Sequence, residues 1–472
     1  MAALGVNPWR DRSALEPLSS KEVLRVIAGL LGVALLCAWP RLVEPGAVFD
    51  AEAAAYQRLA VLGNPELAGP LPLFAGAPLP DFVGHSIVRE FRVTPAMTLT
   101  LLAVLGSFVG GLALWGFLRW LSGRPLASFA AAVIVLVQPW RTTSVADPSL
   151  AWLLGPAIAL LGATWIGRGG GVRAGLIAGL GLALCGWTSF AQLLVLATGV
   201  VLLILAHAPL MRRPFPSGEP VSWRAVLSGV TTCALATAFL LFPAIREGLP
   251  TRMPLSGAPG GGWLAAEDRM QLLGVQLGAE GHHYYWPVLL GWLVFGMLVW
   301  IAIHVRDPRL RPWWILLIAA FILMQGSRLQ VLNHEVRSVV MPHAWFAMLP
   351  GFDRLPGPSA WLPLFGMALA GVLALGLREW QIQHGRATTF LLAALTAAEL
   401  HPPPASPQSM KVPAVYVHMN NGGAGAVLEL PLDPGNAIAL WQAIAVHEHP
   451  VALAPILLGA DASDLPEVPA GL

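Results

Sequence analysis

The feature that most constrains this chain is a stretch from residue 174 to residue 211 that contains no Asp, Glu, Lys or Arg. A membrane helix needs about 20 apolar residues to cross about 30 Å of hydrocarbon. A single helix of this length would overshoot the bilayer, so we expect two helices that meet at Gly186-Trp187-Thr188-Ser189. The composition agrees, because 56% of the residues are hydrophobic and only 11% are charged, with a mean hydropathy of +0.66. The sequence therefore predicts an all-α polytopic membrane protein.

Eleven segments are apolar enough to be candidate transmembrane helices. They lie near residues 26–40, 95–118, 125–139, 149–167, 174–187, 189–207, 225–243, 286–305, 312–325, 359–377 and 387–400. The segments that open at Pro125, Pro312 and Ala387 are short for a full crossing. We expect these three either to be re-entrant or to be covered by neighbouring helices.

Positive charge is distributed unevenly over the connections between these segments. The amino terminus and every second connection together carry sixteen Lys and Arg but only six acids. The basic residues are Arg10, Arg12, Lys21, Arg25, Arg119, Arg124, Arg168, Arg173, Arg212, Arg213, Arg224, Arg306, Arg309, Arg311, Arg378 and Arg386. Because Lys and Arg accumulate in cytoplasmic loops, we expect a bacterial inner-membrane protein with its amino terminus inside and its carboxyl terminus outside.

This orientation divides the chain into two parts. Residues 1–400 would form a transmembrane helical core with outer loops at 41–94, 244–285 and 326–358, and residues 401–472 would form a small outer α/β segment. Residues 427 to 432 in that segment alternate as a strand does. Function is expected at the outer face, where the long loops lie.

Several classes of function are excluded or disfavoured. A formal net charge of +2, without a basic run, excludes nucleic acid as a partner. Cys37, Cys185 and Cys233 lie in apolar stretches, so they form neither a disulfide framework nor a spaced zinc site. The interiors of the predicted spans lack acidic and basic residues, Arg306 standing at the edge of one, which disfavours an ion-coupled transporter. A transporter of an uncharged solute is a remaining alternative.

Short motifs along residues 45 to 455 are similar to one group of bacterial membrane proteins. They are Phe49-Asp50-Ala51-Glu52, Gln138-Pro139-Trp140-Arg141, Trp187-Thr188-Ser189-Phe190, Leu349-Pro350-Gly351-Phe352-Asp353-Arg354-Leu355-Pro356, Glu399-Leu400-His401-Pro402, Val412-Pro413-Ala414-Val415-Tyr416, Val427-Leu428-Glu429-Leu430-Pro431 and Ala445-Val446-His447-Glu448-His449-Pro450. Taken in order, they resemble polytopic proteins related to the GT-C glycosyltransferases. The resemblance implies a GT-C-like helical core and a donor sugar carried on a polyprenyl phosphate lipid.

Asp50 and Glu52 are the candidate catalytic residues that this resemblance implies. Glycosyl transfer needs a base to take a proton from the acceptor hydroxyl, and often a divalent cation held by carboxylates. Two acids separated by one residue at the mouth of the first span resemble the acidic motif of GT-C enzymes. We therefore consider Asp50 and Glu52 also as ligands of Mg²⁺ or Mn²⁺. The plainer interpretation is two solvated acids in a polar loop.

Arg141 and Arg354 are the candidate phosphate-binding residues, because each occupies a family-like turn beside a predicted helix. The planar guanidinium matches phosphate oxygens and keeps its charge when partly buried. Topogenic or interfacial roles are the alternative for both. His85 and Asp147 are further candidates near the substrate, as an aid to Asp50 and as a second acid, although Asp147 before Pro148 also fits a helix N-cap.

The favoured function is transfer of a sugar from a polyprenyl-phosphate carrier to an envelope glycan or lipid, at the outer face of the inner membrane. The alternative is a non-catalytic component with the same fold, which binds lipid or assists assembly.

Overall fold

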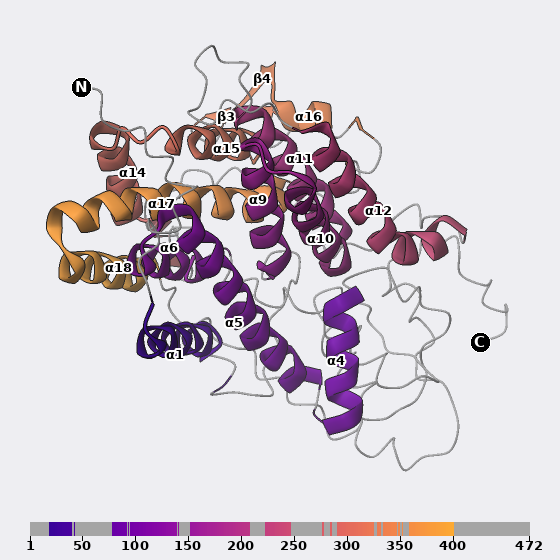
Figure 1. Cartoon of the computed structure of the whole chain (residues 1–472), viewed down its shortest axis with the longest axis horizontal. Helices are drawn as coiled ribbons and strands as arrows, with labels where there is room; N and C mark the ends of the chain where they lie inside the picture. The colour runs from indigo at the N-terminus through magenta and orange to yellow at the C-terminus, as the bar shows by residue number, and fades with distance from the viewer. Residues whose placement is uncertain are drawn as a thin grey trace.

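The computed structural model is built mainly from α-helices (Figure 1). It describes residues 18–39, 78–91, 95–138, 152–207, 222–246, 290–324 and 358–400, with short pieces at 276–277, 284–285, 328–331 and 334–346 and a few single positions such as Trp140 and Phe352.

Each of the eleven predicted spans contains a helix. These helices are α1 (Ser20–Cys37), α5 (Pro95–Ser122), α6 (Pro125–Leu136), α9 (Leu154–Gly167), α10 (Val172–Thr188), α11 (Phe190–His207), α12 (Trp223–Arg246), α14 (Trp292–His304), α15 (Leu310–Leu323), α17 (Leu362–His384) and α18 (Arg386–Leu400). The expected break in the long uncharged stretch is confirmed, because α10 ends at Thr188 and α11 begins at Phe190. Ser189 between them is extended, with φ −166° and ψ 138°.

Three helices within the described residues are long and apolar enough to cross a membrane. They are Met97–Ser122 in α5, Phe190–His207 in α11 and Leu362–His384 in α17. Helices α6, α9, α10, α14 and α15 are apolar but shorter, and the 12 residues of α6 rise only about 18 Å. The expectation that neighbours cover the segment opening at Pro125 is confirmed, since nine of these residues are buried. A total of eleven crossings stays a prediction.

Helix α17 lies at the centre of the helical bundle (Figure 1). Within its most apolar window, 89% of the residues are buried inside the protein, against 50% for α5 and 39% for α11. It packs against α5, α6, α14, α15 and α18. A helix that is apolar all round is stable only when other helices cover every face, and the apolar part of α17 fulfils that condition.

Glycines bring α10 into backbone contact with α9 on one side and α12 on the other. A Cβ on Gly181 of α10 would lie 2.2 Å from the backbone nitrogen of Ala159 in α9. A Cβ on Gly179 would lie 2.3 Å from the carbonyl oxygen of Gly229 in α12. Helices in lipid gain their packing energy from such close approach, because the hydrocarbon around them is as apolar as they are.

Charged residues from several predicted inner connections meet at one end of the bundle, which we call the basic end. The two carboxylate oxygens of Asp307 accept hydrogen bonds from Nε of Arg309, at 3.0 Å for Oδ1 and 2.8 Å for Oδ2. Oδ2 also lies 3.6 Å from a guanidinium nitrogen of Arg378 in α17. The guanidinium of Arg168, after α9, lies 5.3 Å from the ring centre of Trp120 in α5. Burial lowers the pKa of Arg168 to about 9, so it stays protonated at neutral pH. These connections therefore share one end, as the charge pattern predicted.

Tight turns close this end. Gly123 joins α5 to α6, Gly169 joins α9 to α10, and Gly385 joins α17 to α18, with φ of 77°, 83° and 91°. Side chains with a Cβ rarely adopt such angles, so glycine is required where the chain reverses within a few residues. The short turns keep the inner connections compact.

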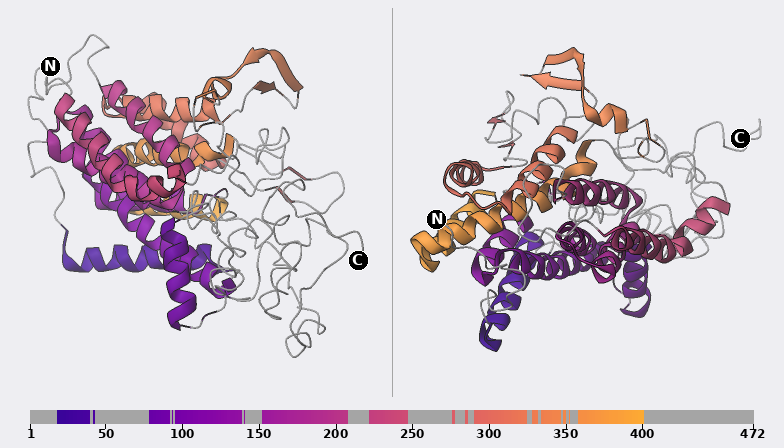
Figure 2. Two further views of the ribbon diagram at one scale, coloured as in Figure 1. Left: turned by 90° about the vertical axis from the view of Figure 1, so that its right-hand side faces the viewer. Right: turned by 45° about the horizontal axis from the view of Figure 1, so that its top comes forward.

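The predicted outer loops contain short elements of their own. Helix α4 (Pro78–Phe91) lies in the loop 41–94 and packs against α5 and α10. Strands β1 (Gln276–Leu277) and β2 (Tyr284–Tyr285) pair in the loop 244–285. Strands β3 (Arg328–Val331) and β4 (His334–Val340) form an antiparallel hairpin that projects from the helices (Figure 2), followed by α16 (Pro342–Phe346) and the 3₁₀-helix η5 (Pro358–Trp361). Among the described residues, strands therefore occur only in the predicted outer loops, and the core is helical.

Candidate functional site

Most of the predicted site residues lie outside the part of the chain that the structure describes. These are Asp50, Glu52, Arg141, Asp147 and Arg354. His85 lies in the middle of helix α4. The predicted α/β segment at 401–472 also lies outside the described residues. The structure does describe residues that are close to several of these positions in the sequence.

Trp140, the residue before Arg141 in the sequence, is packed against α17. Its side chain is fully buried and touches α17, where a Cβ on Gly366 would lie only 2.8 Å from Cζ2 of the indole. Gln138, two residues earlier, is also fully buried. Trp140 is thus held against the first turns of α17, one position before Arg141 in the sequence.

Phe352, two positions before Arg354 in the sequence, belongs to an aromatic cluster. Its ring stacks on Trp361 with centroids 6.3 Å apart and an angle of 19° between the planes. Phe346 packs edge-on against Trp361 at 5.5 Å and touches Phe352 at 5.4 Å. Trp361 is fully buried and is the residue that precedes α17. This aromatic cluster therefore lies at the amino-terminal end of α17.

The residues that Phe352 and Trp140 contact are close together in the sequence. They are Trp361, directly before α17, and Gly366 within it. Trp361 and Gly366 are five positions apart, which is about 7.5 Å along the helix axis at about 1.5 Å per residue. The amino-terminal end of a helix carries a partial positive charge and favours anions nearby. Trp140 and the aromatic cluster around Trp361 therefore both lie at the amino-terminal end of α17, whereas Arg141 and Arg354 lie outside the described residues.

Trp152, the first described residue after Asp147 in the sequence, packs between α5 and α11. The carbonyl oxygen of Trp152 accepts a hydrogen bond of 2.9 Å from Nε2 of Gln192 at the start of α11. The Trp152 indole packs against α5, where a Cβ on Gly106 would lie 2.5 Å from Nε1. Residues 141 to 151 thus run between two buried tryptophans.

The carboxylate of Glu399, in the carboxy-terminal motif, has a structural role. It accepts hydrogen bonds from the backbone nitrogens of Trp292 at 2.6 Å and Leu293 at 3.0 Å. These are the first two residues of α14, so Glu399 of α18 caps the amino terminus of that helix. The acid of this motif is therefore occupied in joining two helices.

The described residues that could hold a metal ion are few. Within the part of the chain that the structure describes, no group of three or more His, Cys, Asp or Glu side chains comes together. Asp50 and Glu52 lie outside that part. The predicted cation site therefore stays a prediction.

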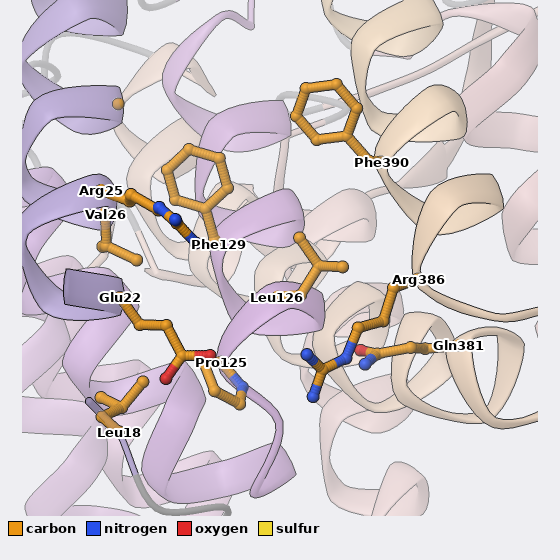
Figure 3. A pocket seen from close by; sticks show the side chains of 11 residues that line it. Leu18, Glu22, Arg25, Val26, Pro125, Leu126, Phe129, Gln381, Arg386 and Phe390 are labelled. Atoms are coloured by element: carbon orange, nitrogen blue, oxygen red, sulfur yellow. The ribbon is translucent and has the colours of Figure 1, made fainter.

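A cavity of about 390 Å³ lies at the basic end, between α1, α6 and the turn that joins α17 to α18 (Figure 3). Apolar side chains line most of it, and Glu22, Arg25, Gln381 and Arg386 supply its polar groups. Sequence reasoning assigned Arg25 and Arg386 to topology alone and did not predict this cavity. The pairing of residues almost 360 positions apart in the chain has no signal in the local sequence.

No family model matches the sequence, and no curated protein does. Among solved structures, the fold is similar to the single-particle cryo-EM structure of the arabinofuranosyltransferase AftD from mycobacteria, with a TM-score of 0.52 and 17% sequence identity. The likeness covers 89% of this chain and 30% of the AftD chain, so this chain corresponds to less than a third of that protein. At this level of identity the likeness is one of fold.

Proposed function

We propose that this chain is a GT-C-type membrane glycosyltransferase that transfers a sugar from a polyprenyl-phosphate carrier to an envelope glycan or lipid at the outer face of the bacterial inner membrane. The observations that support the proposal are the packing of Trp140, which precedes Arg141 in the sequence, and of Phe352, two positions before Arg354, at the amino-terminal end of α17. The fold likeness to an arabinofuranosyltransferase supports the same class of reaction.

The proposed reaction uses the residues in distinct roles. Asp50 takes the proton of the acceptor hydroxyl as its oxygen bonds to the anomeric carbon of the donor sugar. The bond from that carbon to the phosphate oxygen breaks, and the polyprenyl phosphate leaves with the bonding electrons. Arg141 and Arg354 bind the departing phosphate, and the field of α17 adds to their effect.

The remaining candidates would assist this step. Mg²⁺ or Mn²⁺, held by Asp50 and Glu52, would neutralise charge on the leaving phosphate. Carboxylate oxygens are the hard ligands that both ions prefer. Asp147 is proposed as a second acid beside Asp50, and His85 on α4 as its aid from the far end of the same loop.

The test is turnover of labelled polyprenyl-phosphate sugars by membranes that contain the chain and envelope acceptor material. Asp50→Asn keeps the shape of the side chain but removes the base, so we expect turnover to fall by about 10²- to 10⁴-fold. Arg354→Lys keeps the charge but loses the paired donors, so we expect a weaker apparent affinity for the donor.

Glu90→Gln is the matched control, because Glu90 is an exposed acid on α4 in the same predicted loop. This control should retain wild-type turnover at equal protein abundance. Equal losses in Asp50→Asn and Glu90→Gln would remove Asp50 from the chemistry.

A non-catalytic, lipid-binding component is the second candidate function. It is favoured by the 390 Å³ cavity at the basic end, which has a mostly apolar lining and two arginines, Arg25 and Arg386. Absence of turnover by the wild-type chain on every donor supplied with acceptor would favour this second function.

A further inference from the structure

The cavity at the basic end continues as a groove along α6. A second cavity, of about 220 Å³, shares Leu126, Phe129 and Phe390 with the first and extends to Val33 and Val133. From Pro125 to Val133 the groove follows α6 for about 12 Å, at about 1.5 Å per residue. Its inner part is lined by apolar side chains from α1, α6 and α18. The shape suits a hydrocarbon chain that lies parallel to the helices.

The helices on either side of this groove expose apolar side chains. On α18, Phe390 is 60% exposed and Leu391 is 58% exposed, and on α1 Leu24 is 67% exposed. Surfaces of this kind are stable when hydrocarbon surrounds them. The groove therefore opens toward the lipid phase, from which an acyl chain can enter sideways.

The mouth of the groove carries two cations and one anion. Arg25 of α1 and Arg386 of α18 both line it, together with Glu22 (Figure 3). Glu22 is engaged within its own helix, because its carboxylate accepts hydrogen bonds from the backbone nitrogen of Ser19 at 2.9 Å and from Ser19 Oγ at 3.1 Å. The three charges leave the mouth with an excess of one positive charge, which is complementary to a ligand with one negative charge.

Gln381 adds a hydrogen-bond acceptor that the protein does not satisfy. Its side chain is only 7% exposed and lines the cavity, and its Oε1 atom is buried without a hydrogen-bond partner. Buried acceptors nearly always have a donor in a native structure. Because Oε1 is enclosed, a ligand would reach it only after the amide turns into the cavity, and the donor would then be a head-group hydroxyl next to a phosphate.

We propose that this groove is a binding site for one phosphatidylglycerol molecule. The phosphate would lie between Arg25 and Arg386, a glycerol hydroxyl would donate to Oε1 of Gln381, and one acyl chain would follow α6 past Phe129 toward Val133. Phosphatidylethanolamine lacks the net negative charge that the mouth complements, and a polyprenyl monophosphate lacks the head-group hydroxyl. This site is separate from the proposed glycosyl-transfer site, which lies at the other end of α17.

The test is lipid binding by the purified full-length chain in an uncharged detergent, followed by native mass spectrometry. The probes are phosphatidylglycerol, phosphatidylmethanol and phosphatidylcholine with identical acyl chains. We expect the strongest binding for phosphatidylglycerol, weaker binding for phosphatidylmethanol, which has the charge but no hydroxyl, and the weakest for phosphatidylcholine.

Variants separate the contributions of Arg25, Arg386 and Gln381. Replacing both Arg25 and Arg386 with Gln should weaken phosphatidylglycerol binding by about thirtyfold, at about fivefold for each arginine. Gln381→Leu should lower the affinity for phosphatidylglycerol to the affinity for phosphatidylmethanol. The affinity for phosphatidylmethanol should stay unchanged. Arg224→Gln is the control, since Arg224 is an exposed cation at the same end that does not line the groove.

Three results would overturn the proposal. One is equal binding of phosphatidylglycerol and phosphatidylcholine by the wild-type chain. Another is an equal effect of the double arginine variant and Arg224→Gln, both of which change exposed positions and should fold. The third is displacement of phosphatidylglycerol by a stoichiometric polyprenyl monophosphate, which would make the carrier lipid the occupant.

Discussion

Single residues in this protein join elements that are distant in the sequence. Glu399 caps α14 from the end of α18, and Trp140 fills the space above Gly366 of α17. Neither contact is visible in the sequence, where Glu399 is one acid at the edge of an apolar segment. A residue's type therefore indicated what it can do, and its partner was decided by the packing of helices.

The capping carboxylate leads to a prediction about stability. Glu399→Ala leaves two backbone N–H groups of α14 without their acceptor, so we expect a loss of about 1 to 2 kcal/mol in the free energy of unfolding. Glu399→Gln keeps an acceptor and should lose less. Thermal unfolding in detergent measures both, with Gln383→Ala, a change at an exposed position of α17, as the control. Equal midpoints for all three variants would contradict the capping role.

Glu22 leads to a prediction about pH. Hydrogen bonds from Ser19, and then the charges of Arg386 and Arg25, lower the pKa of this carboxyl below its ordinary value of 4.5. The capping box at the start of α1 is therefore fully formed above pH 4.5 and is lost as the pH falls through the lowered pKa. Amide exchange in the first turn of α1, corrected for its intrinsic pH dependence, should accelerate over that range. Glu22→Gln should remove this dependence, and its persistence in that variant would assign it to another group.

At the scale of elements, the positions of the helices along the chain followed from the lengths of the apolar segments. The packing of one helix against another followed from small residues. Each predicted span is a helix in the structure, because uncharged stretches of this length have no other way to satisfy their backbone hydrogen bonds in lipid. The neighbours of each helix were not predictable. Glycines on opposite sides of α10 select α9 and α12, and this choice depends on surface shape in three dimensions.

The close approach of α10 and α12 makes a prediction about Gly179. An alanine there would place Cβ 2.3 Å from the carbonyl oxygen of Gly229, so the helices must separate, and we expect Gly179→Ala to cost about 1 to 3 kcal/mol. The matched control is Gly116→Ala in α5, where nothing lies within 4 Å of the new Cβ. That change should stabilise the helix by up to about 1 kcal/mol. Chemical unfolding in mixed micelles compares the two, and similar effects would contradict the packing argument.

At the scale of the whole molecule, the charge pattern and the fold agree about which connections share an end. Asp307, Arg309, Arg378 and Arg168 come from three predicted inner connections and lie together in the structure. Sequence reasoning obtained this grouping from alternation alone. It could not supply the ion pairs, because their geometry depends on how α15 and α17 pack.

The orientation of the molecule gives a prediction that labelling can check. Gly171→Cys, at an exposed turn of the basic end, should react with a membrane-impermeant maleimide only in inside-out vesicles. Phe91→Cys, at the exposed end of α4, should react only from the outside. The native Cys37 and Cys185 are buried, and Cys233→Ser removes the partly exposed thiol from the background. Labelling of both positions from one side would contradict the predicted topology.

The sequence by itself determined that this chain is a helical membrane protein, where its helices run and which connections lie together, because hydropathy, segment length and charge are local properties. The tertiary structure decided what those properties leave open. It packed Trp140 and Phe352 at the amino-terminal end of α17 and brought Arg25, Gln381 and Arg386 around one groove. Such groupings depend on contacts between residues hundreds of positions apart, and these are selected by the fit of one helix surface against another.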